Sequence, residues 1–96
     1  MKILITGVAG FIGFNLAQHL LKIDKKNKII GLDILNNYYS VELKKNRLKA
    51  LKNKNFSFLK IDICKKKKLE KIFKIHKPDL VINLAAQAGV RYSVDY

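Results

Sequence analysis

The chain has 96 residues, 49% of them hydrophobic and 28% charged, a length and composition that allow one small globular domain and exclude an intrinsically disordered chain. Its 20 Lys and Arg residues outnumber its 7 Asp and Glu residues, which gives a formal net charge of +13. Because nearly all of this excess is lysine and no helix-turn-helix or zinc-ligand spacing accompanies it, we interpret it as solvated surface and expect no binding to nucleic acid.

The first half of the chain predicts a strand, a helix and a second strand. Lys2–Thr6 has a continuous apolar run, which is typical of a strand buried on both faces. In Phe11–Ile23 apolar residues recur at helical spacing, so we expect this face of the helix to lie on the sheet. The face consists of Ile12, Leu16, Leu20 and Ile23. Lys28–Asp33 is the second predicted strand.

The second half predicts two further pairs of a helix and a strand. Residues 36–40 have turn chemistry, and Ser40 is a candidate N-cap for a helix with a lysine-rich exposed surface. Residues 56–61 form the third strand, and a third helix follows and ends before Pro78. The fourth strand spans residues 79–84. The apolar spacing of the two helices comes from Val41, Leu43, Leu48 and Leu51 in the first, and from Leu69, Ile72, Phe73 and His76 in the second.

Alternating strands and helices of these lengths require parallel pairing through right-handed crossovers, which predicts an α/β fold with a doubly wound parallel sheet of strand order 3-2-1-4. Ligands of such sheets bind at the carboxyl ends of the strands, beside the switch point between the first and fourth strands. Four segments lie at those ends: residues 7–13, Asp33, Asp62 and residues 85–89. The fourth strand is almost wholly apolar and suits pairing on both sides. We therefore expect residues 1–96 to be the amino-terminal part of a larger enzyme, without its remaining strands and substrate domain.

Gly7, Gly10 and Gly13 form a glycine-rich turn between the first strand and the first helix. Glycines in such a turn let the chain bend sharply, let the backbone approach a pyrophosphate and let the helix pack closely, while the helix N-terminus attracts phosphate. The spacing is one residue wider at the first gap than the dinucleotide fingerprint, and a strand-to-helix turn without a ligand is the alternative. Asp33 favours the binding site, because it lies about 20 residues beyond the glycines, where these folds place the acid that binds ribose.

Cys64 is the single cysteine, so no internal disulfide is possible and the chain suits a reducing cytoplasm. No C-x-x-C pair or histidine-rich cluster predicts a metal site. No run of about 18 apolar residues predicts a membrane segment. His19 and His76 lie within helix patterns, far in sequence from a partner acid or nucleophile, so we expect structural or solvent-facing roles for both.

These motifs together resemble the extended short-chain dehydrogenase/reductase family, the NAD-dependent epimerases and dehydratases that act on nucleotide sugars. The resemblance covers the whole chain and depends on residues 6–13, Asp33, Asp62 with Ile63, and residues 84–86. It implies a Rossmann-like domain with NAD as the cofactor, and the charge of Asp33 favours NAD over NADP because it repels a 2′-phosphate. The implied cofactor-binding residues are Gly7, Ala9, Gly10, Phe11, Ile12, Gly13, Asp33, Asp62, Ile63, Leu84, Ala85 and Ala86.

Residues 33–39 and 87–93 are most similar to UDP-glucuronate 4-epimerases. This similarity implies an isomerase in which NAD+ takes a hydride from C4 of a UDP-hexuronate-type substrate and returns it to the other face of the sugar. It also implies substrate contacts for Gln87, Arg91 and Tyr92, and a homodimer for the complete enzyme. The guanidinium of Arg91 suits carboxylate or phosphate oxygens.

The family's proton-transfer pair, a tyrosine with a lysine four residues later, does not occur in this sequence. General acid–base catalysis contributes about a hundredfold to ten-thousandfold, so we expect no catalytic residue here and essentially no turnover from this piece alone.

Other interpretations stay open for the whole chain and for single residues. The function could be that of a nucleotide-sugar dehydratase of the same family, of a non-catalytic dinucleotide-binding regulatory module, or of a basic nucleic-acid binder, which requires steeply salt-dependent binding. Asp33 and Asp62 are also typical of turns at strand ends. Ala85 and Ala86 also suit helix–strand packing, and Arg91 also suits an exposed surface.

Overall fold

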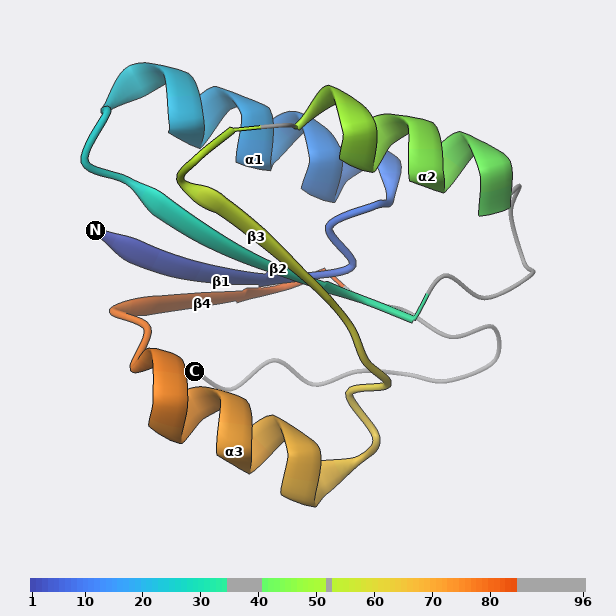
Figure 1. Ribbon diagram of the computed structural model, residues 1–96, viewed down its shortest axis with the longest axis vertical. Helices are drawn as coiled ribbons and strands as arrows, with labels where there is room; N and C mark the ends of the chain where they lie inside the picture. The colour runs from blue at the N-terminus through green and yellow to red at the C-terminus, as the bar shows by residue number, and fades with distance from the viewer. Residues whose placement is uncertain (35–40, 52, 85–96) are drawn as a thin grey trace.

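The structure is a computed structural model that describes residues 1–34, 41–51 and 53–84 (Figure 1). Strands and helices alternate along these residues, as the sequence predicts. In chain order the elements are β1 (Lys2–Thr6), α1 (Phe11–Ile23), β2 (Lys28–Asp33), α2 (Val41–Ala50), β3 (Phe56–Lys60), α3 (Lys66–His76) and β4 (Leu80–Asn83).

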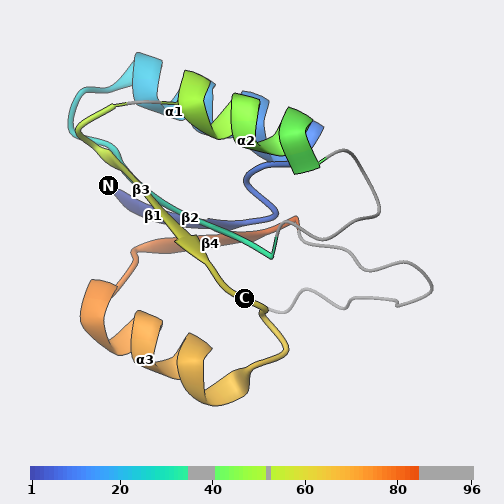
Figure 2. The same ribbon diagram turned by 45° about the vertical axis from the view of Figure 1, so that its right-hand side comes forward.

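The four strands form one parallel sheet in the order β3-β2-β1-β4, which confirms the predicted doubly wound topology. In the register of the central strands, Ile5 lies between Gly31 of β2 and Ile82 of β4. Helices α1 and α2 cover one face of the sheet and α3 covers the other (Figures 1 and 2). All four carboxyl ends therefore lie at one edge, where the predicted site segments begin.

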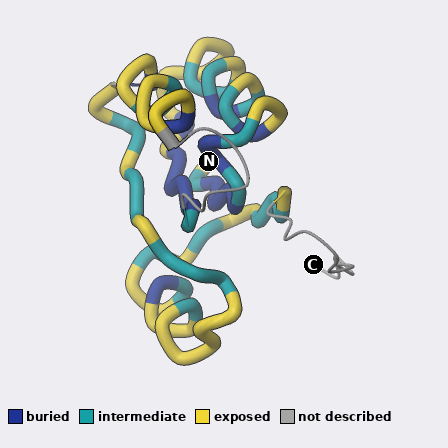
Figure 3. The backbone as a smooth tube through the Cα atoms, turned by 90° about the vertical axis from the view of Figure 1, so that its right-hand side faces the viewer, coloured by how far each residue is buried: buried dark blue, intermediate teal, exposed yellow. Residues whose placement is uncertain are grey.

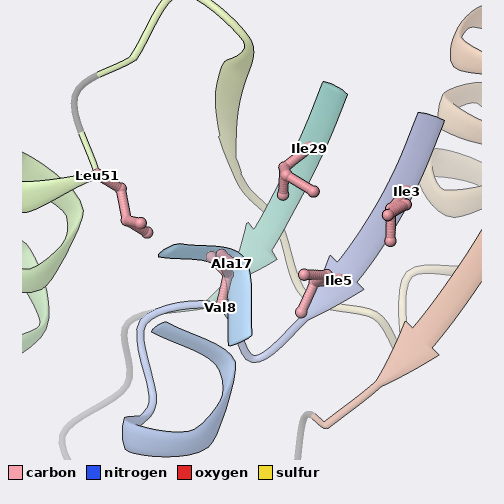
Figure 4. Packing of buried hydrophobic residues seen from close by; sticks show 6 residues of the cluster. All are labelled: Ile3, Ile5, Val8, Ala17, Ile29 and Leu51. Carbon is pink, nitrogen blue, oxygen red and sulfur yellow. The ribbon is translucent and has the colours of Figure 1, made fainter. Parts of the chain in front are cut away.

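Successive residues of the central strands point to opposite faces of the sheet and so build two apolar layers. The layer between the sheet and the helices α1 and α2 consists of Ile3, Ile5, Val8, Ala17, Ile29 and Leu51 (Figure 4). The layer between the sheet and α3 consists of Leu4, Ile30, Leu32 and Ile72. Fully burying an aliphatic side chain contributes about 1.5–3 kcal/mol, so these layers are the main source of stability. Figure 3 shows the buried positions in the middle of the molecule, with exposed positions along the outer sides of the helices.

The predicted sheet-facing side of α1 is partly wrong. Ile12 is 66% exposed and Ile23 is 59% exposed, whereas Gly13 and Ala17 are the buried residues of this helix. The reason is steric, because α1 approaches the turn after β1 so closely that only small side chains fit beneath it. A Cβ atom at Gly13 would lie 2.3 Å from the carbonyl oxygen of Gly7. Small residues therefore mark the contact face of α1, with Leu16 and Leu20 half-buried beside it.

The fourth strand is less buried than its sequence predicts. Leu80 is 44% exposed and the rest of β4 is half-buried, although its apolar composition predicts a strand covered on both faces. In the described part of the chain β4 lies at an edge of the sheet and pairs with β1. The start of β4 is fixed to β1 by Asp79, the residue before the strand. The backbone N–H of Asp79 donates to the carbonyl of Lys2 (2.7 Å), and its carboxylate accepts the Lys2 N–H (2.8 Å).

The described helices include none that is both long enough and apolar enough to cross a membrane. Residues 36–40 and the predicted N-cap Ser40 lie outside the described residues, as does the loop 85–89.

Candidate functional site: the glycine turn and the end of the second strand

The glycine turn has a conformation that depends on its glycines. Gly7 has a φ of 69°, in the left-handed region that residues with a side chain rarely adopt. The Gly10 N–H donates to the Gly7 carbonyl (3.0 Å), and a Cβ at Gly10 would lie 3.3 Å from the same oxygen. Gly10 is also the N-cap of α1 and brings no side chain to the first-turn N–H groups. This helix end is therefore suited to an anion, as the sequence predicts.

The turn is fastened to β2, the strand beside it. The N–H groups of Gly7 and Val8 both donate to the carbonyl of Leu32, at 2.8 and 3.2 Å. Val8 and Ala9 are fully buried, so the turn is part of the core. Gly31 permits this approach, because a Cβ there would lie 2.7 Å from the Val8 Cγ1. Gly31 is not among the predicted site residues, because it stands inside an apolar run with no turn chemistry around it.

Asp33 ends β2 directly beside the turn, where the sequence predicts it. Its carboxylate Oδ2 accepts the backbone N–H of Ala9 at 3.0 Å, and the residue is only 5% exposed. The other oxygen, Oδ1, lies 3.5 Å from the Nζ atom of Lys44. The turn after β1 and the acid after β2, 24 positions apart, are thus joined directly. This contact places the proposed ribose acid at the edge of the proposed phosphate cradle.

Two basic residues of α2 complete this cluster, and sequence reasoning missed both. Lys44 is 8% exposed, so the interpretation of the lysine excess as solvated surface does not hold at this position. The free-energy cost of burying its ammonium group is offset by the ion pair with Asp33. Arg47, one turn later on the same side of α2, donates from Nη1 to the Ala9 carbonyl (3.0 Å), and its guanidinium carbon lies 5.9 Å from the Phe11 ring centroid. The Lys44-x-x-Arg47 spacing places the two residues on one side of α2, but it does not show that this side faces the end of β2.

The Ala9 residue is therefore held from both sides. Asp33 accepts its N–H and Arg47 donates to its carbonyl. Phe11 and Ile12, which follow at the start of α1, are both exposed. Their apolar side chains thus lie on the surface next to the cradle, which is compatible with the cofactor contacts expected of them.

At the switch point, polar side chains outside the predicted site residues join the carboxyl ends of β1 and β4. The hydroxyl of Thr6 donates to Oδ1 of Asn83, and the backbone N–H of Leu84 donates to the Thr6 hydroxyl oxygen at 3.0 Å. These contacts hold the carboxyl ends of the two strands together. They place Leu84, one of the predicted cofactor-binding residues, at the same edge of the sheet as the glycine turn.

Asp62 has the turn contacts of its alternative interpretation. Its Oδ1 accepts the Cys64 N–H (2.9 Å) and its carbonyl accepts the Lys65 N–H (2.9 Å), which forms the turn before α3. Asp62 and Ile63 are half-buried. The Ile61 N–H donates to the Asp33 carbonyl (3.1 Å), so this segment begins beside the end of β2.

The remaining predicted site residues, Ala85, Ala86, Gln87, Arg91 and Tyr92, lie outside the described residues. In the part of the chain that the structure describes, no group of three or more His, Cys, Asp or Glu residues is placed to hold a metal ion.

Comparison with known proteins agrees with the motifs. The family model described as GDP-mannose 4,6 dehydratase matches residues 4–96. Protein CapI from Staphylococcus aureus is 52% identical over 95 residues, which are 99% of this chain and 28% of that protein. A UDP-glucuronate 4-epimerase from Thermodesulfobacterium geofontis is 47% identical over 96% of this chain and 28% of its own length.

A solved structure agrees with the fold. The UDP-glucuronic acid 4-epimerase from Bacillus cereus, crystallised in complex with UDP-glucuronic acid and NAD, superposes with a TM-score of 0.81 and 39% identity. The match covers 95% of this chain and 28% of that one. This chain therefore spans less than a third of the length of these relatives. The glycine turn, the adjacent Asp33, the strand order and the match over residues 4–96 together show that the chain belongs to the GDP-mannose 4,6 dehydratase family, within the extended short-chain dehydrogenase/reductases.

Proposed function

We propose that this chain is the NAD-binding part of a nucleotide-sugar epimerase that acts on UDP-glucuronate. The observation that carries this proposal is the contact between Ala9 and Asp33, which puts a buried carboxylate beside a glycine turn at the N-terminus of α1. Relatives that carry the name UDP-glucuronate 4-epimerase match nearly the whole chain, and the Bacillus cereus enzyme was crystallised with NAD.

The described residues fit a dinucleotide. A side chain at Gly13 would collide with the backbone of Gly7, so the turn keeps a backbone surface close enough for a pyrophosphate. The N–H groups of the first turn of α1 then face the phosphate charge. Asp33 accepts hydrogen bonds from the adenosine ribose, while Phe11 and Ile12 cover the cofactor from the exposed side.

In this function NAD, when bound, would accept a hydride from one carbon of the sugar and return it to the same carbon. The part of the work that falls to this chain is to hold the dinucleotide at the carboxyl edge of the sheet. The contacts of Thr6 with Asn83 and Leu84 keep the strand ends together there. Asp62 and Ile63 on the adenine side, Leu84, Ala85 and Ala86 along the cofactor, and Gln87, Arg91 and Tyr92 at the substrate complete the proposed assignments.

The proposed activity is that of the whole protein, of which residues 1–96 are one part. We assign residues 1–96 to the amino-terminal part of the cofactor-binding domain, because the chain matches 28% of the length of the relatives named above. Tyr-x-x-x-Lys, the substrate domain and the contacts of a homodimer belong to the remainder, so the piece alone is inactive. The exposed Cys64 is compatible with a reducing cytoplasm.

A dehydratase of the same family is the second candidate, since the matching family model is described by that activity. The two reactions give different products from the complete protein. We expect UDP-glucuronate to be converted to an isomer of unchanged mass, which mass spectrometry and NMR of the sugar detect. Loss of one water from GDP-mannose, or from another nucleotide sugar whose hexose is uncharged, would assign the dehydratase if UDP-glucuronate is not epimerised. Binding of NAD with no turnover of either sugar would assign the non-catalytic module.

A further inference from the structure

Arg47 reaches from α2 onto the two residues that flank the N-cap of α1. Its Nη1 atom donates to the Ala9 carbonyl across 3.0 Å, in a part-buried contact between residues 38 positions apart. Its guanidinium carbon lies 5.9 Å from the centroid of the Phe11 ring. Helices α1 and α2 lie on the same face of the sheet, which brings these contacts within reach (Figures 1 and 2). A side chain of α2 therefore contacts the glycine turn where α1 begins.

The start of α1 is not capped by a side chain of its own. Gly10 is the N-cap and makes no side-chain cap hydrogen bond, and the described helix has no acidic residue in its first turn. Glycine also leaves the backbone more conformational freedom than other residues do. The conformation of the turn therefore depends on contacts from other elements, and the contact with Arg47 is one of them.

The peptide group between Ala9 and Gly10 is held at both of its polar atoms. Its N–H, from Gly10, donates to the Gly7 carbonyl (3.0 Å), and its oxygen, from Ala9, accepts the Arg47 guanidinium (3.0 Å). Because a peptide group is planar, fixing both atoms prevents its rotation, and the N–H groups that follow at the start of α1 keep their direction. In the proposed function these N–H groups face the pyrophosphate. The Arg47 contact thus orients the phosphate-binding surface before a ligand binds.

Preorganisation of this kind raises affinity, because the ligand does not have to order the turn on binding. We propose that Arg47 is a positioning residue for the pyrophosphate of the coenzyme, acting through Ala9 and not by contact with the phosphates. The inference rests on the proposed function, since it takes the glycine turn as the pyrophosphate site. It adds one prediction: loss of Arg47 weakens binding of the pyrophosphate part of the coenzyme and not of its adenosine.

The test is titration calorimetry of the coenzyme-free complete protein with adenosine and with ADP. ADP carries the pyrophosphate that adenosine lacks, so the ratio of the two dissociation constants measures what the glycine turn contributes. We expect Arg47→Met to weaken ADP binding by about three- to tenfold, the range that corresponds to one hydrogen bond, and to leave adenosine binding unchanged. The matched control is Lys49→Met, which removes a positive charge from an exposed position of the same helix and should change neither constant.

The positive charge of Arg47 is the alternative cause of weaker ADP binding, and salt separates the two causes. A charge acting through solvent is screened as the Debye length falls from about 10 Å at 0.1 M to about 3 Å at 1 M salt, whereas the hydrogen bond to Ala9 is a short contact. We expect the difference in ADP affinity between Arg47→Met and the unmodified protein to persist over this range. A difference that disappears at high salt would show that Arg47 acts by its charge, and the inference would be wrong.

The remaining outcomes separate this inference from the proposed function. An equal loss of affinity for adenosine and ADP would assign Arg47 to the stability of the fold, and unchanged ADP binding would remove its role. In both cases the inference is wrong and the proposed function stands. If the unmodified protein binds neither NAD nor ADP, the proposed function itself is wrong and this inference with it.

A second measurement needs no ligand. Amide hydrogen exchange reports local opening of the backbone, so coenzyme-free Arg47→Met should exchange faster at Ala9 and Gly10, whose N–H groups are hydrogen-bonded in the turn. Exchange in α3, on the opposite face of the sheet (Figure 2), should increase by a smaller factor or not at all. Equal factors in the turn and in α3 would show a general loss of stability and would overturn the inference.

Discussion

The backbone N–H of Ala9 donates to Oδ2 of Asp33 across 3.0 Å, so the last residue of β2 fixes the turn that follows β1. The same carboxylate therefore has two tasks. It stabilises the ligand-free turn, and in the proposed function it also binds the coenzyme ribose. Substitutions that separate these tasks test the site most directly.

Asp33→Ala removes both tasks. We expect NAD affinity of the complete protein to fall by about 1–3 kcal/mol, the cost of leaving charge-linked hydrogen bonds unmade, and stability to fall as well because the buried Ala9 N–H loses its acceptor. Asp33→Asn should lower NAD affinity with less loss of stability, since an amide oxygen remains. Titration calorimetry and urea unfolding measure the two effects. The exposed Asp24→Ala is the control for affinity, and unchanged affinity in Asp33→Ala would remove this residue from the site.

Gly13→Ala tests the close approach of α1 to the glycine turn. The new Cβ would lie 2.3 Å from the Gly7 carbonyl oxygen, and because this atom is backbone no side chain can rotate away. We expect a loss of about 1–3 kcal/mol in the free energy of unfolding, the usual range for overpacking, together with weaker NAD binding. Gly10→Ala is the matched control, since its Cβ would lie 3.3 Å from the same oxygen and should cost less. Equal unfolding midpoints for Gly13→Ala and the unmodified protein would contradict the packing.

Local patterns in the sequence were sufficient to predict the seven elements and the strand order. Continuous apolar runs define buried parallel strands, and the alternation with helices leaves few topologies. The glycine spacing and the position of Asp33 predicted the turn and its acid, because each depends on a short segment and on the general geometry of such sheets.

The errors concern contacts between elements. The contact face of α1 is set by how closely Gly13 approaches Gly7, and the apolar spacing of the helix does not show this. The burial of Lys44 depends on where α2 lies relative to the end of β2, so a lysine-rich helix gives no sign of it. The contact between Thr6 and Asn83 joins residues 77 positions apart, and only the assembled sheet shows it.

Arg47→Met tests the second contact of the glycine turn. Its guanidinium donates to the Ala9 carbonyl, a part-buried bond, and lies over the Phe11 ring. We expect a loss of about 0.5–1.5 kcal/mol in the free energy of unfolding, the usual net value of such a hydrogen bond. Urea denaturation provides the measurement, with Lys49→Met on the exposed side of the same helix as control. If both variants lose the same stability, the effect belongs to the helix and not to its contact with the turn.

Lys77→Gly should stabilise the protein through the end of α3. Lys77 has a φ of 46°, and its N–H donates to the Phe73 carbonyl, the arrangement in which a helix ends on a left-handed residue. A side chain in this conformation costs about 1–2 kcal/mol that glycine does not incur, partly offset by the greater freedom of glycine in the unfolded chain. We therefore expect a net gain of about 0.5–1 kcal/mol in urea unfolding. Lys74→Gly, three residues earlier inside the same helix, removes the same charge but should lose about 1 kcal/mol. A loss of stability in both variants would show that the left-handed cap at Lys77 carries no strain.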